Sequence, residues 1–172
     1  MTVARRNIEL KARLHDRDAA TQACRTLNAR PEGDIHQTDT YFGVPEGRLK
    51  LRESTPGDDY LVFYRRPDVA AVKGCDYTIA VVPRGLKPVL TAALGVIGVV
   101  DKVRTLYLWE NVRIHLDRVQ GLGDFIEFEA VLGAEYDDAD GEEKLARLSR
   151  AFALAPADLL AHSYLELLDN AR

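Results

Sequence analysis

The stretch that decides the fold is Gly47-Arg48-Leu49-Lys50-Leu51-Arg52-Glu53. Its residues alternate strictly, so a β-strand would turn the leucines to one side of a sheet and Arg48, Lys50 and Arg52 to the other. The cations would then stand about 7 Å apart with no acid between them. Like charges this close are unfavourable without a counter-charge. The stretch therefore predicts a strand with one apolar face and one face suited to an anion.

The same division into an apolar and an ionic face recurs along most of the chain. Period-two alternation and turn residues predict eight strands. They are Arg5–His15, Gln37–Phe42, Arg48–Glu53, Asp59–Arg66, Lys73–Val82, Val99–Trp109, Asn111–Val119 and Asp124–Ala134. An eight-stranded antiparallel sheet tends to close, because closure removes its exposed edges.

Helical spacing of apolar residues predicts four helices. The first runs near Arg17–Ala29, with Pro31 and Gly33 after its end, and the second near Arg84–Ile97. A third carries Leu145, Leu148 and Phe152 on one side, and a fourth starts near Pro156 and turns Leu160, Tyr164, Leu167 and Leu168 inward. We expect an α+β fold, an eight-stranded antiparallel β-barrel with helices packed on the outside, formed by residues 1–172 as a single domain.

Composition narrows the class of protein. A net charge of −4 argues against a general nucleic-acid binder, which would usually be basic. The sequence shows no secretory signal and no apolar run long enough to span a membrane. Cys24 and Cys75 are far apart and lack metal-ligand spacing. We therefore expect a reduced, cytoplasmic protein without a membrane partner.

The ionic strand faces carry more bases than acids. The bases are Lys11, Arg13, Arg48, Lys50, Arg52, Arg66, Lys73, Lys102, Arg104 and Arg113, and the acids are Glu9, Asp39, Asp117, Glu127 and Glu129. For a single strand, a solvated outer face explains such alternation. For the whole set, a basic barrel lumen explains it better, since the helices cover the outside. Such a lumen suits a polyanion, and its carboxylates suit a divalent metal.

The order of the motifs resembles the CYTH superfamily, the triphosphate tunnel metalloenzymes, and most of all its class IV adenylate cyclase-type branch. Arg6-Asn7-Ile8-Glu9-Leu10-Lys11 is similar to the family's Glu-x-Glu-x-Lys strand. Further matching segments are Gln37–Phe42 with Gly47–Glu53, Tyr64–Asp68 with Lys73–Tyr77, Val100–Arg104, Asp117 with Gly121–Glu129, and Ser163-Tyr164 with Leu167-Leu168. The match spans nearly the whole chain.

The resemblance implies a tunnel that binds a triphosphate together with Mg²⁺ or Mn²⁺. Carried over by position, the metal ligands are Glu9, Glu127 and Glu129, with Asp117 close by, and the catalytic set is Lys11, Glu127 and Glu129. The implied substrate contacts are Lys11, Arg13, Tyr41, Arg48, Lys50, Arg52, Arg66, Lys73, Lys102, Arg104 and Arg113. Alternation allows either Arg65 or Arg66, but not both, to face the lumen. Since family members are often dimers, a homodimer stays open.

Two residues depart from the family pattern. Asn7 stands where the first Glu is usual, and its amide oxygen brings no charge, which leaves one or two metal ions open. Cys75 stands where Ser is usual, and we interpret it as a small substitute.

Three functions fit this lumen. The first expectation is an adenylate cyclase-like activity that converts ATP into cyclic AMP and pyrophosphate. The alternative is a triphosphatase that hydrolyses inorganic or thiamine triphosphate. A non-catalytic protein that binds a phosphorylated metabolite is the third. The first two need the same cations and the same metal, so strand periodicity does not separate them.

Overall fold

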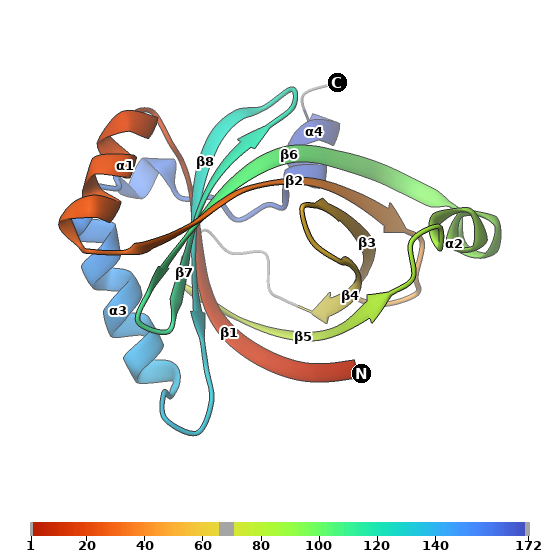
Figure 1. Ribbon diagram of the computed structural model, residues 1–172, viewed down its shortest axis with the longest axis horizontal. Helices are drawn as coiled ribbons and strands as arrows, with labels where there is room; N and C mark the ends of the chain where they lie inside the picture. Colours follow the sequence, from red (N-terminus) through yellow and green to blue (C-terminus); the bar gives the residue numbers. More distant parts are fainter. Residues whose placement is uncertain (1, 66–70, 171–172) are drawn as a thin grey trace.

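The chain forms a closed barrel in which every strand pairs with two neighbours (Figure 1). The computed structural model describes residues 2–65 and 71–170. The strands are β1 (Thr2–Arg13), β2 (Arg30–Phe42), β3 (Arg48–Thr55), β4 (Asp59–Arg65), β5 (Lys73–Val82), β6 (Val96–Trp109), β7 (Val112–Val119) and β8 (Gly123–Val131). Their order around the barrel is β1-β5-β4-β3-β2-β6-β7-β8, and all pairs are antiparallel. The predicted eight-stranded antiparallel barrel is confirmed.

Local capping residues explain where the helices α1 and α3 begin. They are α1 (Arg17–Thr26), α2 (Lys87–Leu94), α3 (Asp138–Ala151) and α4 (Tyr164–Asn170), with a 3₁₀ turn at Pro156–Asp158. The carboxylate of Asp16 accepts the Ala19 N–H at the start of α1, and Asp137 and Asp140 form a capping box at the start of α3. Among the described residues, no helix is long and apolar enough to cross a membrane.

Several boundaries differ from the sequence expectation. β2 begins at Arg30 rather than Gln37, and α2 spans Lys87–Leu94 rather than Arg84–Ile97. α1 ends at Thr26, because Asn28 adopts a left-handed conformation with φ of 54°. Pro31 and Gly33 therefore do not follow the helix directly but lie inside β2, where a register shift against β6 accommodates them. The predicted helix from Pro156 is also divided, into the 3₁₀ turn and α4.

The apolar core lies between the outer face of the barrel and two helices. Ile8, Ile114 and Phe128 point outward from β1, β7 and β8, and pack with Cys24 of α1 and Leu145 of α3. Figure 1 shows α1 and α3 together on this side of the barrel, with α2 on the opposite side. Because this larger apolar cluster is buried outside the sheet, part of the lumen is left for polar side chains, and a second, smaller apolar cluster lines the rest.

The short helix α4 lies across one end of the barrel rather than on its side. The ring of Tyr164 packs at 5.0 Å from the ring of Phe125, and its hydroxyl reaches Asp117 inside the lumen. A Cβ added at Gly98 of β6 would come within 2.2 Å of Leu165 Cδ1. The missing side chain at Gly98 is thus what lets α4 approach the start of β6 so closely.

Candidate functional site

Three lumen cations converge on one buried carboxylate. Asp39 is 2% exposed, and its oxygens accept hydrogen bonds from Lys50 Nζ at 2.9 Å, Arg52 Nε at 2.7 Å and Lys102 Nζ at 2.9 Å. These side chains come from β2, β3 and β6, which are adjacent in the barrel. Three basic side chains thus share one acidic partner, so the cluster carries a net positive charge.

The protonation of this cluster follows from that imbalance. Burial alone would raise the pKa of Asp39, but the charges of Arg52, Lys102 and Lys50 outweigh it and hold the pKa well below its usual range. For Lys102, burial lowers the pKa to about 7, and Arg52, Arg104 and Lys50 act in the same direction against Asp39. Lys102 is therefore poised to take up a proton when an anion approaches.

A second cluster is built on Arg104. This guanidinium forms a bidentate ion pair with Asp117, donating to Oδ1 at 2.7 Å and to Oδ2 at 2.6 Å. It also donates to Glu127 Oε2 at 2.9 Å. The Tyr164 hydroxyl donates to Asp117 at 2.9 Å. Burial opposes ionisation of Asp117, yet Arg104 lowers its pKa to about 2. Asp117 therefore anchors Arg104, and its oxygens already have two partners.

Glu127 and Glu129 lie side by side on the lumen face of β8. Glu127 contacts Lys11 Nζ at 3.3 Å and His115 Nδ1 at 3.2 Å, and Glu129 contacts Arg113 Nη1 at 3.3 Å. Burial would raise the pKa of Glu127, but Lys11, the His115 hydrogen bond and Arg104 keep it well below the usual range. Both carboxylates are thus ionised and have protein cations as partners.

The donor set around these carboxylates fits a hard divalent cation. Glu9 is the register partner of Glu129 across β1 and β8, and Asn7 Nδ2 donates to Glu129. The side-chain oxygen Oδ1 of Asn7 is buried and has no hydrogen-bond partner among the described residues, and a cation would satisfy it. Mg²⁺ and Mn²⁺ prefer such oxygen ligands. Among the described residues, no three acidic, His or Cys side chains are already gathered as a metal cluster.

The remaining predicted residues fall into three groups. Tyr41 is buried, with Lys50 Nζ 5.5 Å from its ring centre, and Glu9 is half-buried. Arg13 is exposed at the end of β1, with its guanidinium carbon 5.5 Å from the Phe125 ring centre. Arg65 is exposed and donates to Glu46, so it faces outward. Arg66 and the side chain of Lys73 lie outside the described residues.

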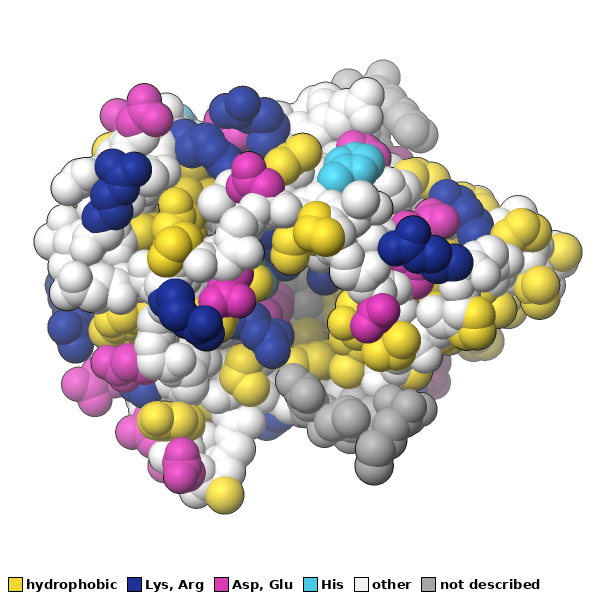
Figure 2. All heavy atoms as spheres, in the orientation of Figure 1, with side chains coloured by type: hydrophobic (Ala, Val, Ile, Leu, Met, Phe, Trp, Pro, Cys, Tyr) yellow, Lys and Arg dark blue, Asp and Glu magenta, His cyan; other side chains and the backbone are white. Residues whose placement is uncertain are grey.

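Sequence reasoning missed part of the lumen lining. Tyr60, Val62, Tyr64, Tyr77 and Ile79 of β4 and β5 form an apolar and aromatic side of the lumen, packed with Tyr164. Both faces of these two strands carry apolar residues. The sequence alone therefore does not show which face points into the lumen. Figure 2 shows the molecule hollowed near its centre, with basic, acidic and hydrophobic side chains at the rim.

α4 supplies two side chains that sequence reasoning did not place in the lumen. Tyr164 lies under Lys11, whose Nζ is 4.2 Å from the ring centre, and Glu166 accepts from Arg48 Nη2 at 2.5 Å. The sequence signal was indirect: Ser163-x-x-Glu166 has the spacing of a capping box, which predicts a helix start and not a charge inside a barrel.

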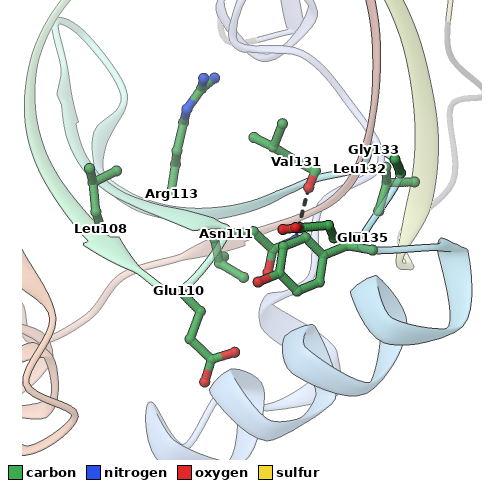
Figure 3. A pocket seen from close by; sticks show the side chains of 11 residues that line it. Leu108, Glu110, Asn111, Arg113, Val131, Leu132, Gly133 and Glu135 are labelled. Atoms are coloured by element: carbon green, nitrogen blue, oxygen red, sulfur yellow. Dashed lines mark hydrogen bonds between the residues drawn. The ribbon is translucent and has the colours of Figure 1, made fainter.

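A groove of about 410 Å³ opens at the barrel end opposite α4. The β6–β7 turn and the segment after β8 line it, and Arg113 belongs to both the groove and the lumen. Figure 3 shows Arg113 and Glu110 pointing to opposite sides of this groove. The groove therefore lies beside the Arg113 end of the lumen.

Comparison with known proteins identifies the architecture. The model of the CYTH domain matches residues 5–164. The chain belongs to the CYTH family. Adenylate cyclase CyaB of Aeromonas hydrophila is 27% identical over 95% of this chain and 88% of its own length.

Solved structures share the fold of this chain. The PH1012 protein of Pyrococcus horikoshii is 26% identical, with a TM-score of 0.80 over 94% of this chain and 98% of that one. A Hippeastrum protein studied as an adenylyl cyclase, and described as having a dominant triphosphatase activity, is 15% identical with a TM-score of 0.63 over 96% of each chain. At that identity the likeness supports the CYTH fold alone.

Proposed function

We propose that this CYTH protein is a divalent-metal-dependent enzyme that acts on a triphosphate in its lumen, and that it converts ATP into cyclic AMP and pyrophosphate. The observation that carries the proposal is the meeting of two cation clusters with the Glu127–Glu129 pair inside a closed barrel. Hydrolysis of inorganic or thiamine triphosphate is the alternative, because the same cations would hold those molecules.

The cation arrangement supports binding by exchange of partners. In the chain alone, Lys50, Arg52 and Lys102 share the carboxylate of Asp39. A triphosphate carries enough negative charge to supply the balance that one carboxylate lacks. In a buried site such interactions are screened little by salt, so they are stronger than at a surface.

Each group has a role in the proposed reaction. The ribose 3′-hydroxyl would give up its proton to solvent water, its oxygen would attack the α-phosphorus, and the bond between that phosphorus and the bridging oxygen would break, so that pyrophosphate leaves. Lys50, Arg52, Lys102 and Arg104 would stabilise the charge on the leaving pyrophosphate. Glu9, Glu127 and Glu129, with the Asn7 carbonyl, would hold Mg²⁺ or Mn²⁺, which supplies charge neutralisation and lowers the pKa of the attacking hydroxyl. Lys11, next to Glu127, would orient a phosphate beside them.

An organic triphosphate is favoured by the aromatic side of the lumen. Tyr60, Tyr64 and Tyr77 offer rings on which an aromatic base could pack, which an inorganic triphosphate would not use. Relatedness to a protein named adenylate cyclase points the same way.

The proposed function is tested by product identification. Purified protein with Mg²⁺ or Mn²⁺ is offered ATP, inorganic triphosphate and thiamine triphosphate separately. We expect cyclic AMP and pyrophosphate from ATP. Release of orthophosphate instead would select the triphosphatase, and binding without turnover under either metal would reject both enzyme functions in favour of a binding protein.

Lys102 gives a prediction for proton uptake. Its pKa near 7 leaves it about one-tenth protonated at pH 8. Phosphate oxygens favour the charged form, so binding raises this pKa and takes up close to one proton. Affinity should therefore fall as the pH rises from 7 to 9. Titration calorimetry of ATP binding at pH 8, in two buffers of different ionisation enthalpy, measures the uptake. It should be lost in Lys102→Met, and equal uptake in both proteins would contradict the assignment.

Asn7 gives a prediction for metal affinity. Asn7→Glu adds a charged oxygen ligand beside Glu129, and we expect Mn²⁺ to bind about tenfold more tightly because ligand charge tunes affinity for such ions. Electron paramagnetic resonance of free Mn²⁺ measures this directly. Gln120→Glu, in the exposed β7–β8 turn, is the control for added charge. Equal effects of the two substitutions would show that Asn7 does not face the metal.

A further inference from the structure

We propose that Glu166 occupies a phosphate position on Arg48, so that substrate and the docked helix α4 compete for the same guanidinium. The inference rests on the proposed function, since it concerns the same lumen. Because Glu166 competes with the ligand for Arg48, it lowers the affinity of the chain for the triphosphate. A ligand therefore needs more negative charge to displace it.

The position of Arg48 makes it the outer member of a cation row. Arg52, Lys50 and Arg48 follow one another on the lumen face of β3, at a spacing of about 7 Å. Arg48 is the first residue of β3, at the end of the barrel where α4 lies. Arg52 and Lys50 contact Asp39, whereas Arg48 donates to Glu166 at 2.5 Å. The row thus ends on a carboxylate that belongs to a different element from the barrel.

That carboxylate is well suited to exchange. Glu166 Oε1 faces Arg48, while Oε2 accepts from the backbone N–H of Ser163 at 2.7 Å and from its hydroxyl at 2.8 Å. The second oxygen keeps its partners when the first loses Arg48, so no buried acceptor is left unsatisfied. The Arg48 and Glu166 side chains are 24% and 33% exposed, so solvent weakens the pair. A phosphate chain with several charges should displace it readily.

α4 depends on its contacts with the barrel. It has seven residues, too short to be stable alone, and is held by the packing of Tyr164, Leu165, Leu167 and Leu168 and by the Arg48–Glu166 pair. Loss of one of these contacts on ligand binding should therefore loosen the helix.

Glu166→Gln is a sharp test because Gln also serves at this position of a capping box, so the substitution removes charge and keeps the cap. We expect the Kd for inorganic triphosphate, measured by calorimetry without metal, to fall about fivefold, as for loss of a partly exposed ion pair. Glu142→Gln on the exposed side of α3 removes the same charge elsewhere and should leave the Kd unchanged. In an Arg48→Met background, the effect of Glu166→Gln on the Kd should be smaller than in the unmodified chain.

Hydrogen exchange gives an independent measurement on the unmodified chain. Saturating inorganic triphosphate should speed exchange of the amides of residues 167–170. Slower exchange there, or a Kd that Glu166→Gln leaves unchanged or raises, would overturn the inference while triphosphate binding still stands. An unmodified chain that binds no triphosphate would remove the proposed function and this inference together.

Discussion

Glu127→Gln is expected to reduce triphosphate turnover by at least about a hundredfold, the usual cost of losing a charged group at the reacting centre. Glu127 contacts the lumen cations and also belongs to the proposed set of metal ligands. It contacts Lys11 at 3.3 Å and Arg104 at 2.9 Å, and it lies on the same strand face as Glu129. The amide keeps the shape of the side chain but supplies no charge to a metal or to these cations. Initial rates at saturating ATP and Mg²⁺ measure the effect.

Two controls separate loss of chemistry from loss of binding. Without metal, inorganic triphosphate should bind Glu127→Gln at least as well as the unmodified chain, because a negative charge has left the lumen. Glu142→Gln should keep full turnover. A Glu127→Gln protein that retains more than a tenth of the turnover would show that this carboxylate does not hold the metal.

The barrel was predictable because its ionic face alternates with an apolar one on most strands. Arg48, Lys50 and Arg52 were expected on one face, and in the structure Lys50 and Arg52 meet Asp39 inside the lumen. Because successive side chains of a strand point to opposite faces of the sheet, this alternation in the sequence reappears as two distinct faces in the folded barrel. The helices α1 and α3 were likewise visible from their apolar stripes.

The ion pairs inside the lumen were not predictable. Alternation shows on which face of the sheet a side chain lies, but not which residue it contacts. Asp39 was placed among the lumen acids, but its position between three cations depends on the register of β2 with both β3 and β6. Tyr164 was expected to point inward from a helix on the outside. That it points into the lumen depends on α4 crossing the barrel end, and on the close approach that Gly98 allows.

The expected destabilisation by Asp39→Asn is the second large effect. The substitution keeps the volume and some hydrogen bonds, but it leaves Lys50, Arg52 and Lys102 without their shared counter-charge inside the barrel. Breaking a buried ion pair by removing one partner usually costs about 3–5 kcal/mol. Lys102 already has a pKa near 7 and can lose its proton, which relieves part of the repulsion. We therefore expect the free energy of unfolding in urea to fall by about 3 kcal/mol.

Asp101→Asn is the matched control, since this carboxylate lies on the neighbouring strand β6 but on its outer face, paired with His36 at 2.9 Å and about one-third exposed. Its loss should cost less than about 1 kcal/mol. Inorganic triphosphate distinguishes a charge defect from a packing defect. A ligand that supplies the missing negative charge binds the folded state and stabilises it by mass action, so it should raise the melting temperature of Asp39→Asn more than that of the unmodified chain. Equal stabilisation of both proteins would mean that the cations around Asp39 do not receive the phosphates, and the triphosphate would then have to be placed on the other lumen cations, such as Arg104, Lys11 and Arg48.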